Sequence, residues 1–142
     1  METGRDGSNF VLYIVDADAS VRDALCRLAT SVAIEVRSFA TAEDFVAQAS
    51  PDAGGCVLLD SSLLAAASRL VQKGRPHVLD WPVIVMCASD SEARAARIEA
   101  RRLGARLLLS KPLDAQALLD AVAWVTEDEG QSLISEPEGD VK

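Results

Sequence analysis

The chain has 142 residues, with 14 Lys and Arg against 22 Asp and Glu, so its net charge is −8. Hydrophobic residues make up 49% of it, which excludes disorder over most of the chain and predicts a single folded domain. No apolar run approaches the ~20 residues that span a bilayer, and the acidic charge argues against direct binding of nucleic acid by this domain.

The first predicted strand is the apolar run from Phe10 to Val15. It shows no alternation, which is typical of a strand buried on both faces. Apolar residues then recur at helical spacing over 21–32, and Asp18 or Ser20 is placed to cap that helix. The segment therefore predicts a buried strand followed by an amphipathic helix.

The next unit is more exposed. Residues 33–39 alternate between apolar and polar side chains, which predicts a strand with one solvated face. Thr41 and Asp44 resemble a capping box at the start of a helix over 42–49. Residues 51–55 contain Pro and Gly and predict a turn.

A third unit has a buried strand over 56–59, which ends at Asp60, and a helix over 63–71. The fourth has a buried strand over 83–87. Its helix begins with a second capping box, formed by Ser89 and Glu92, and ends at Leu103.

The last unit has a buried strand over 106–109, then Lys111 and Pro112, and a helix around 118–125. Five alternating strands and helices predict an α/β fold with a parallel sheet covered on both faces. An open doubly wound, flavodoxin-like sheet suits this length, because a closed eight-unit barrel needs roughly 250 residues.

Three charged side chains stand at the carboxyl ends of three predicted strands. They are Asp16, Asp60 and Lys111. In an open parallel sheet ligands bind at this edge, and the strand order 2-1-3-4-5 would make the first and third strands neighbours. Each residue alone could be a turn residue, a helix cap or a solvated charge. Together they predict one site.

These residues, with their flanking runs, resemble the response-regulator receiver domain of bacterial two-component signalling, the CheY-like family, over residues 9–126. The matching segments are Tyr13-Ile14-Val15-Asp16, Val57-Leu58-Leu59-Asp60, Leu103-Gly104-Ala105 and Lys111-Pro112.

The resemblance implies a role for each residue of the predicted site. Asp60 would be the phosphoacceptor, Asp16 and Asp60 would hold Mg²⁺, and Lys111 would contact the phosphoryl group. The donor would be a histidine kinase or a phosphotransfer protein in a phosphorelay. Such a domain is not an enzyme beyond self-catalysed phosphoryl transfer to Asp60. Carboxylate attack on phosphorus gives an acyl phosphate, and a cation and a lysine stabilise the charge.

Four departures from the family pattern point to an atypical domain. Ala17 replaces the second acid after the first strand, and Asp18 is a candidate replacement ligand. Cys87 stands at the Thr or Ser switch position, where its thiol is a weaker donor. Residues 61–68 lack the usual Met-Pro and Gly, and Leu108 replaces an aromatic residue.

Three functions therefore stay open. Asp60 is phosphorylated with weakly bound Mg²⁺, or the domain is a pseudo-receiver that binds no Mg²⁺ and signals through protein contacts alone. The third is a small phosphatase, because Asp16-Ala17-Asp18 also resembles the start of haloacid-dehalogenase-type phosphatases. There Asp16 would be the nucleophile and Asp18 the general acid.

The remaining expectations concern partners and setting. Arg94, Arg97 and Arg101 lie on one face of the fourth helix, a candidate surface for an output domain or a homodimer with the last helix. A flexible N-terminus is expected over 1–8 and an acidic disordered tail or linker over 127–142. Three cysteines without a CxxC motif and a polar N-terminus predict a cytoplasmic protein without a membrane contact.

Overall fold

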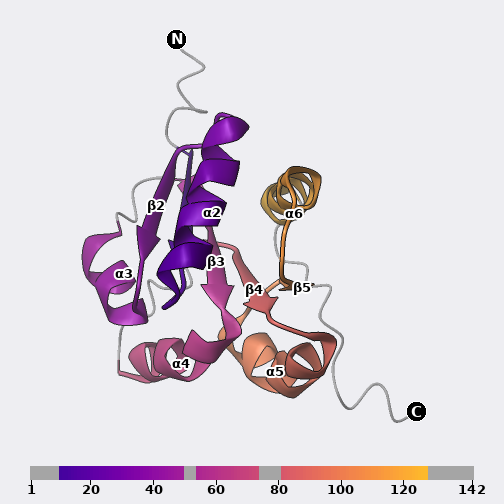
Figure 1. Cartoon of the computed structure of the whole chain (residues 1–142). Helices are drawn as coiled ribbons and strands as arrows, with labels where there is room; N and C mark the ends of the chain where they lie inside the picture. Colours follow the sequence, from indigo (N-terminus) through magenta and orange to yellow (C-terminus); the bar gives the residue numbers. More distant parts are fainter. Residues whose placement is uncertain (1–9, 50–53, 74–80, 128–142) are drawn as a thin grey trace.

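The computed structural model describes residues 10–49, 54–73 and 81–127. Its single sheet has five parallel strands in the order β2-β1-β3-β4-β5, which confirms the predicted topology (Figure 1). The strands are β1 (Phe10–Val15), β2 (Val36–Phe39), β3 (Gly54–Asp60), β4 (Val83–Cys87) and β5 (Leu107–Ser110).

Helices connect the strands and cover both faces of the sheet. They are α2 (Ala19–Ser31), α3 (Ala42–Gln48), α4 (Leu64–Gln72), α5 (Asp90–Leu103) and α6 (Ala115–Glu127), and a short 3₁₀ turn, η1 (Ser61–Leu63), precedes α4. In Figure 1, α2 and α6 lie on one side of the sheet, and α3, α4 and α5 lie on the other.

Two apolar layers result from the alternation of side chains along each strand. In β1, Leu12 and Ile14 point into the layer under α2 and α6. Tyr13 points the other way and packs against Phe45 and Trp81, with ring centroids 5.3 and 4.9 Å apart. Because both faces of the central strands are covered, their sequences are apolar throughout.

The predicted helix caps are present, with one difference. Of the two predicted candidates, Asp18 caps α2, and Thr41 caps α3 by accepting from Asp44 N at 3.0 Å. Ser89 caps α5 by accepting from Glu92 N at 3.1 Å. The side chain of Glu92 accepts from Ala88 N instead of closing the capping box on Ser89.

Three predicted strands differ from the observed ones, two in where they begin and one in its burial. The second strand begins at Val36 because Ala33 has a left-handed φ of 63° after the end of α2. The third begins at Gly54, inside the predicted turn, and a Cβ at Gly55 would clash with the carbonyl oxygen of Val11. The fifth is only half-buried, because β5 forms an edge of the sheet.

The predicted N-terminal segment 1–8 and the tail beyond Glu127 lie outside the described residues. Glu127 itself is the last residue of α6. None of the helices in the described parts of the chain is long and apolar enough to cross a membrane.

Candidate functional site

The predicted site residues lie together at the carboxyl edge of the sheet. Asp16 follows β1, Asp60 is the last residue of β3, Cys87 is the last residue of β4, and Lys111 follows β5. The neighbouring positions of β1, β3 and β4 in the sheet bring these ends side by side. The parallel topology alone thus assembles residues that are up to 95 positions apart in the chain.

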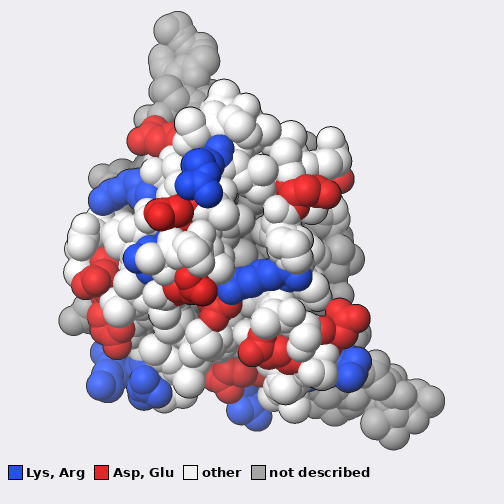
Figure 2. All heavy atoms as spheres, in the orientation of Figure 1, with Lys and Arg blue, Asp and Glu red and all other residues white. Residues whose placement is uncertain are grey.

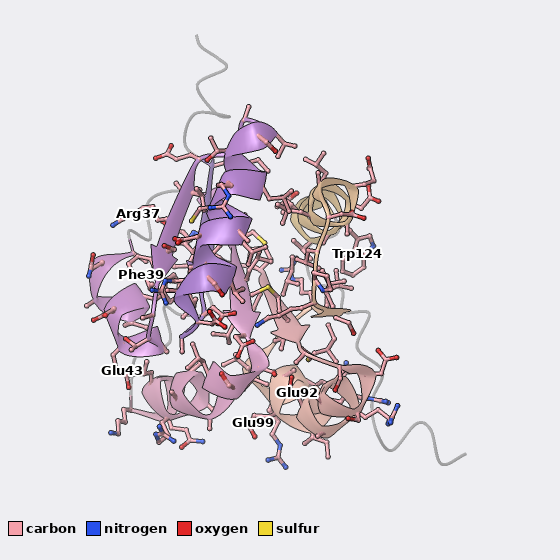
Figure 3. All side chains as sticks on the ribbon, in the orientation of Figure 1. Arg37, Phe39, Glu43, Glu92, Glu99 and Trp124 are labelled. Atoms are coloured by element: carbon pink, nitrogen blue, oxygen red, sulfur yellow. The ribbon has the colours of Figure 1, made fainter. Side chains whose placement is uncertain are left out.

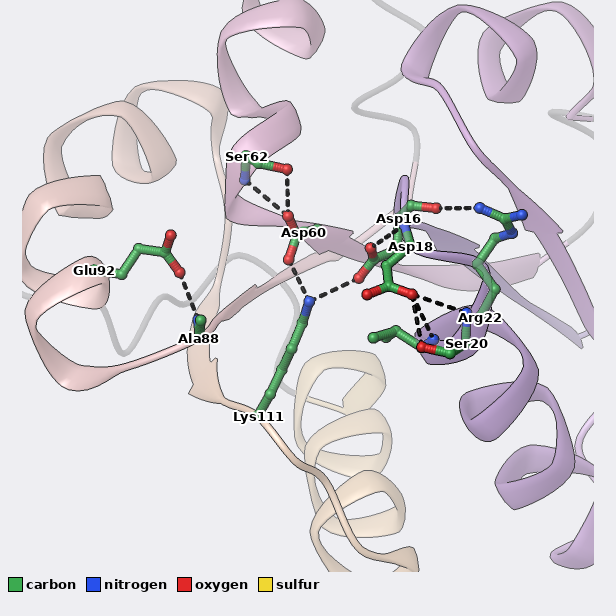
Figure 4. A network of polar contacts seen from close by, with 10 residues as sticks. Asp16, Asp18, Ser20, Arg22, Asp60, Ser62, Ala88, Glu92 and Lys111 are labelled. Atoms are coloured by element: carbon green, nitrogen blue, oxygen red, sulfur yellow. Dashed lines mark hydrogen bonds and ion pairs between the residues drawn. The ribbon is translucent and has the colours of Figure 1, made fainter.

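Lys111 bridges the two carboxylates (Figure 4). Its Nζ lies 2.8 Å from Asp16 Oδ2 and 2.5 Å from Asp60 Oδ1. Burial by itself would lower the pKa of Lys111, but hydrogen bonds and charge from Asp16 and Asp60 outweigh it and raise that pKa. The ammonium group therefore stays protonated and balances part of the negative charge.

Asp60 is the acceptor in two sets of hydrogen bonds. Oδ1 accepts from Lys111, and Oδ2 accepts from the backbone N–H of Ser62, at 3.0 Å, and from the Ser62 hydroxyl. Burial would raise the pKa of Asp60, but the bonds from Lys111 and Ser62 and the charge of Lys111 lower it below its usual value. Asp60 is therefore an ionised carboxylate whose oxygens are both engaged.

Asp16 is the most deeply buried acid of the site, with 2% of its surface exposed. Its Oδ1 accepts from the backbone N–H of Asp18 at 2.9 Å. Its backbone oxygen accepts from Arg22 Nη1 at 2.7 Å, which ties the start of α2 to the end of β1. These contacts hold the carboxylate in place beside Lys111.

Asp18 serves as the cap of α2. Its Oδ1 accepts from the backbone N–H and the hydroxyl of Ser20, at 2.9 and 2.7 Å. The bonds from Ser20 and Val21 lower the pKa of this exposed carboxyl group. In Figure 4 the second carboxylate oxygen of Asp18 points away from Ser20, toward the side of Lys111.

Cys87 and Ala17 differ in their surroundings. Cys87 is fully buried, and its pKa is raised first by burial and also by the charges of Glu92 and Asp60, against a hydrogen bond with Ser61. Ala17 is exposed between the two acids. The structure thus offers space for a carboxylate at position 17 but places none there.

Two residues at the site were not assigned a role there from the sequence. Ser62 binds Asp60, and the serine pair after an aspartate is a signal for such a turn. Glu92 was expected only as a helix cap, although its carboxylate accepts from the backbone at the end of β4. Neither position could be placed at the site by strand ends alone.

The donor set of the site suits a magnesium ion. Mg²⁺ prefers oxygen ligands and keeps several waters, so one or two carboxylates can bind it. Asp16 and Asp60 supply two carboxylates within reach of one Lys111 ammonium. Among the described residues, no group of three or more acidic, Cys or His side chains is arranged to hold a metal. The residues therefore fit Mg²⁺, with few protein ligands.

A family model for the response regulator receiver domain matches residues 12–123. The chain belongs to this family. Receiver domains of response regulators act with histidine kinases and output domains and are generally not enzymes in the ordinary sense. The family assignment leaves the phosphatase alternative for Asp16 and Asp18 without support.

Sequence similarity to curated proteins agrees with this family assignment. The transcriptional regulatory protein TdiR of Thauera aromatica is 32% identical over 123 residues, 86% of this chain and 53% of TdiR. Nodulation protein W of Bradyrhizobium diazoefficiens is 32% identical over 119 residues, 82% of this chain and 51% of that protein. The receiver domain here thus spans about half the length of these curated relatives.

A solved structure supports the same assignment. A response regulator receiver protein from Burkholderia phymatum is 31% identical, with a TM-score of 0.65, and the match covers 89% of this chain and 98% of that one. This receiver domain therefore shares both the sequence pattern and the fold of an experimentally determined member.

Proposed function

We propose that this receiver domain takes part in a phosphorelay, with Asp60 as its phosphoacceptor and a histidine kinase or phosphotransfer protein as donor. The observation that carries the proposal is the contact between Lys111 Nζ and Asp60 Oδ1 at 2.5 Å, beside the buried Asp16. An ionised carboxylate with a cation at its side is the arrangement that phosphoryl transfer to an aspartate needs.

The chemistry is a displacement at phosphorus. A carboxylate oxygen of Asp60 forms a bond to phosphorus and gives an acyl phosphate. The bond between phosphorus and the donor atom breaks, and its electron pair leaves on a histidine nitrogen or, from acetyl phosphate, on the oxygen of the released acetate. Lys111 remains protonated and faces the new negative charge, as its raised pKa allows.

Mg²⁺ would be held by Asp16 and Asp60 and would neutralise charge on the phosphoryl group. Its binding is weak for two reasons. Ala17 supplies no carboxylate, and the Lys111 ammonium shares the oxygens that the ion would use. Asp18 is a further ligand only through the oxygen that does not cap α2.

Phosphorylation of Asp60 is therefore expected to be slow. The Ser62 hydroxyl and N–H both engage Oδ2, so these bonds must rearrange before the acceptor reacts. Cys87 replaces a hydroxyl at the end of β4 and is a poor donor toward a phosphoryl oxygen. The site keeps its acceptor and its lysine but has lost part of the surrounding support.

A second candidate is a pseudo-receiver that signals through protein contacts without phosphate. The contact of Lys111 with both Asp16 and Asp60 also favours this function. Both oxygens of Asp60 are already bound, and Lys111 neutralises the two acids without a metal. In that case the Asp16–Lys111–Asp60 network would be structural, and replacing Asp60 would change stability more than signalling.

A surface on α5 is proposed as the contact with a second copy of the chain. It comprises Arg94, Arg97 and Arg101, and Ile98, with 49% of its surface exposed, lies among them. Charge reversal of Arg97 and Arg101 to Glu should abolish self-association in sedimentation velocity, whereas Arg27→Glu on α2 should not. Unchanged association would exclude this surface, and loss of binding only to an output domain would assign it to that partner instead.

The acceptor role is tested by intact mass of the full chain after incubation with acetyl phosphate and Mg²⁺. The proposal expects one added phosphoryl group on the wild type and none on Asp60→Asn. A folded wild-type chain that stays unmodified would favour the pseudo-receiver, and an adduct that persists in Asp60→Asn would place the phosphate elsewhere.

A further inference from the structure

The carboxylate of Glu92 occupies a backbone donor at the end of β4. Its Oε1 accepts from the N–H of Ala88 at 2.5 Å (Figure 4). In a capping box this carboxylate would accept from the N–H of the cap residue itself. Here the cap residue is Ser89, but the Glu92 carboxylate accepts from the N–H of Ala88, the residue before the cap and nearer the sheet edge. Helix capping alone does not require that reach.

The Ala88 N–H belongs to the same edge as the acceptor. Asp60 pairs with Met86 across β3 and β4, so Ala88 lies two residues beyond the level of Asp60. The backbone N–H of Lys111 donates to Cys87 O at 2.8 Å, and the side chain of Lys111 returns to Asp60. In Figure 4 the pair formed by Ala88 and Glu92 lies on the other side of Lys111 from Asp16.

Glu92 also shares a hollow with the residues that flank Asp60. This hollow, of about 500 Å³, lies between α4 and α5 and is lined by Ser61, Ser62 and Glu92 near the acceptor and by Glu99 further along α5. Figure 3 shows Glu92 and Glu99 on the side of α5 toward α4. Glu92 therefore lines the end of the hollow near Ser61 and Ser62, which follow Asp60 in the chain, and Glu99 lines the same hollow farther along α5.

The charges of Glu92 and Asp60 act on a common group. Both contribute to raising the pKa of the Cys87 thiol, after the larger effect of burial. A phosphoryl donor that approaches Asp60 brings further negative charge into this region. Backbone N–H groups at such an edge are ordinary ligands for anionic oxygen, and Glu92 both adds a like charge and occupies one of these donors.

We propose that Glu92 is a built-in brake on phosphorylation: a carboxylate that takes the Ala88 N–H and repels the incoming phosphoryl group. The brake rests on the proposed acceptor role of Asp60. A phosphoryl group on Asp60 would displace the Glu92 carboxylate, which connects the acceptor to the first turn of α5. Glu92 is thus a positioning and regulatory residue, and it takes no part in bond making.

The test is a time course of intact mass with acetyl phosphate and Mg²⁺ on the full chain. Glu92→Gln keeps an oxygen that can accept from Ala88 N–H but removes the charge. It should be phosphorylated roughly fivefold faster than the wild type at low salt, and the difference should shrink as salt is raised. Glu99→Gln, with the same charge change in the same hollow, should leave the rate unchanged.

The outcomes separate the brake from the acceptor role. Equal rates for the wild type and Glu92→Gln, or an equal increase in Glu99→Gln, would overturn the brake and leave the acceptor role intact. No adduct on any of these chains would overturn the acceptor role and the brake with it. A purely structural role of Glu92 would lower the thermal midpoint of Glu92→Gln without a salt-dependent change in rate.

Discussion

At the scale of single residues, the charge balance of the site depends on Lys111. It is the cation that contacts both Asp16 and Asp60, and only 21% of its side chain is exposed. Without it, two largely buried carboxylates would face each other across the edge of the sheet. Such pairs are costly when one partner is removed, because an uncompensated charge is left behind.

Replacement of Lys111 by Met should therefore lower the free energy of unfolding by about 2 kcal/mol at neutral pH, less than for a fully buried pair because the side chain is part-exposed. Urea denaturation measures this, and Lys73→Met, at an exposed lysine after α4, is the matched control. Equal stability of the two variants would contradict the bridge as a stabilising element.

The loss of stability in Lys111→Met should depend on pH. The pKa of Asp60 is lowered in the folded protein and that of Lys111 is raised. The stabilisation is therefore present above the unfolded Asp value of about 4 and below the unfolded Lys value of about 10. It disappears as pH falls through the folded pKa of Asp60 or rises through that of Lys111, so the two lysine variants should converge below about pH 4.

Under the proposed function, Ala17 is the residue that we expect to limit metal binding most directly. Because position 17 is exposed between Asp16 and Asp18, Ala17→Asp adds a carboxylate without disturbing the core. We expect it to raise the Mg²⁺-dependent rate of phosphorylation about tenfold, and Ala17→Asn, which lacks the charge, to give a much smaller gain. A rate that does not respond to Mg²⁺ in Ala17→Asp would show that the metal site is not limiting.

At the scale of elements, the sequence predicted where strands and helices lie better than where they begin. The apolar runs of β1 and β4 were bounded correctly, because strands buried on both faces have no polar positions. The start of β2 was missed because of the left-handed turn at Ala33. Such turns are usually marked by Gly or Asn, and an alanine at this position does not indicate one. The half-buried β5 was taken as buried because its edge position follows from topology and not from its own residues.

The strain at Ala33 gives an element-scale prediction. Gly tolerates a φ of 63° without the Cβ penalty, so Ala33→Gly should raise the free energy of unfolding by roughly 0.5–1 kcal/mol. Ala123→Gly, at an exposed position inside α6, should lower it by about 1 kcal/mol. Chemical denaturation decides the sign, and destabilisation of similar size in both variants would contradict the account of this turn.

At the scale of the whole molecule, the candidate site could be predicted because topology does most of the placing. Once five parallel strands in the order 2-1-3-4-5 were expected, Asp16, Asp60 and Lys111 had to share one edge. The contacts of Ser62 and Glu92 could not be predicted this way, because they depend on how the loops after β3 and β4 turn.

The charges on the face shown in Figure 2 do not single out another function. On the face shown in Figure 2, acidic and basic side chains are interspersed and do not form one continuous basic area. This agrees with a domain that works through protein contacts and phosphoryl transfer. The proposed chemistry rests instead on the contacts among Asp16, Asp60 and Lys111 at the edge of the sheet.

The most direct test of the account is to locate the phosphorylated residue by peptide mass spectrometry in the full chain treated with acetyl phosphate and Mg²⁺. Borohydride reduction releases the phosphate from the acyl phosphate and leaves homoserine in place of the modified aspartate. The account predicts that Asp60 is the modified residue. The modification should form slowly and should be absent from Asp60→Asn. Modification at Asp16 or Asp18 instead, or none at Asp60 in a folded chain, would contradict it.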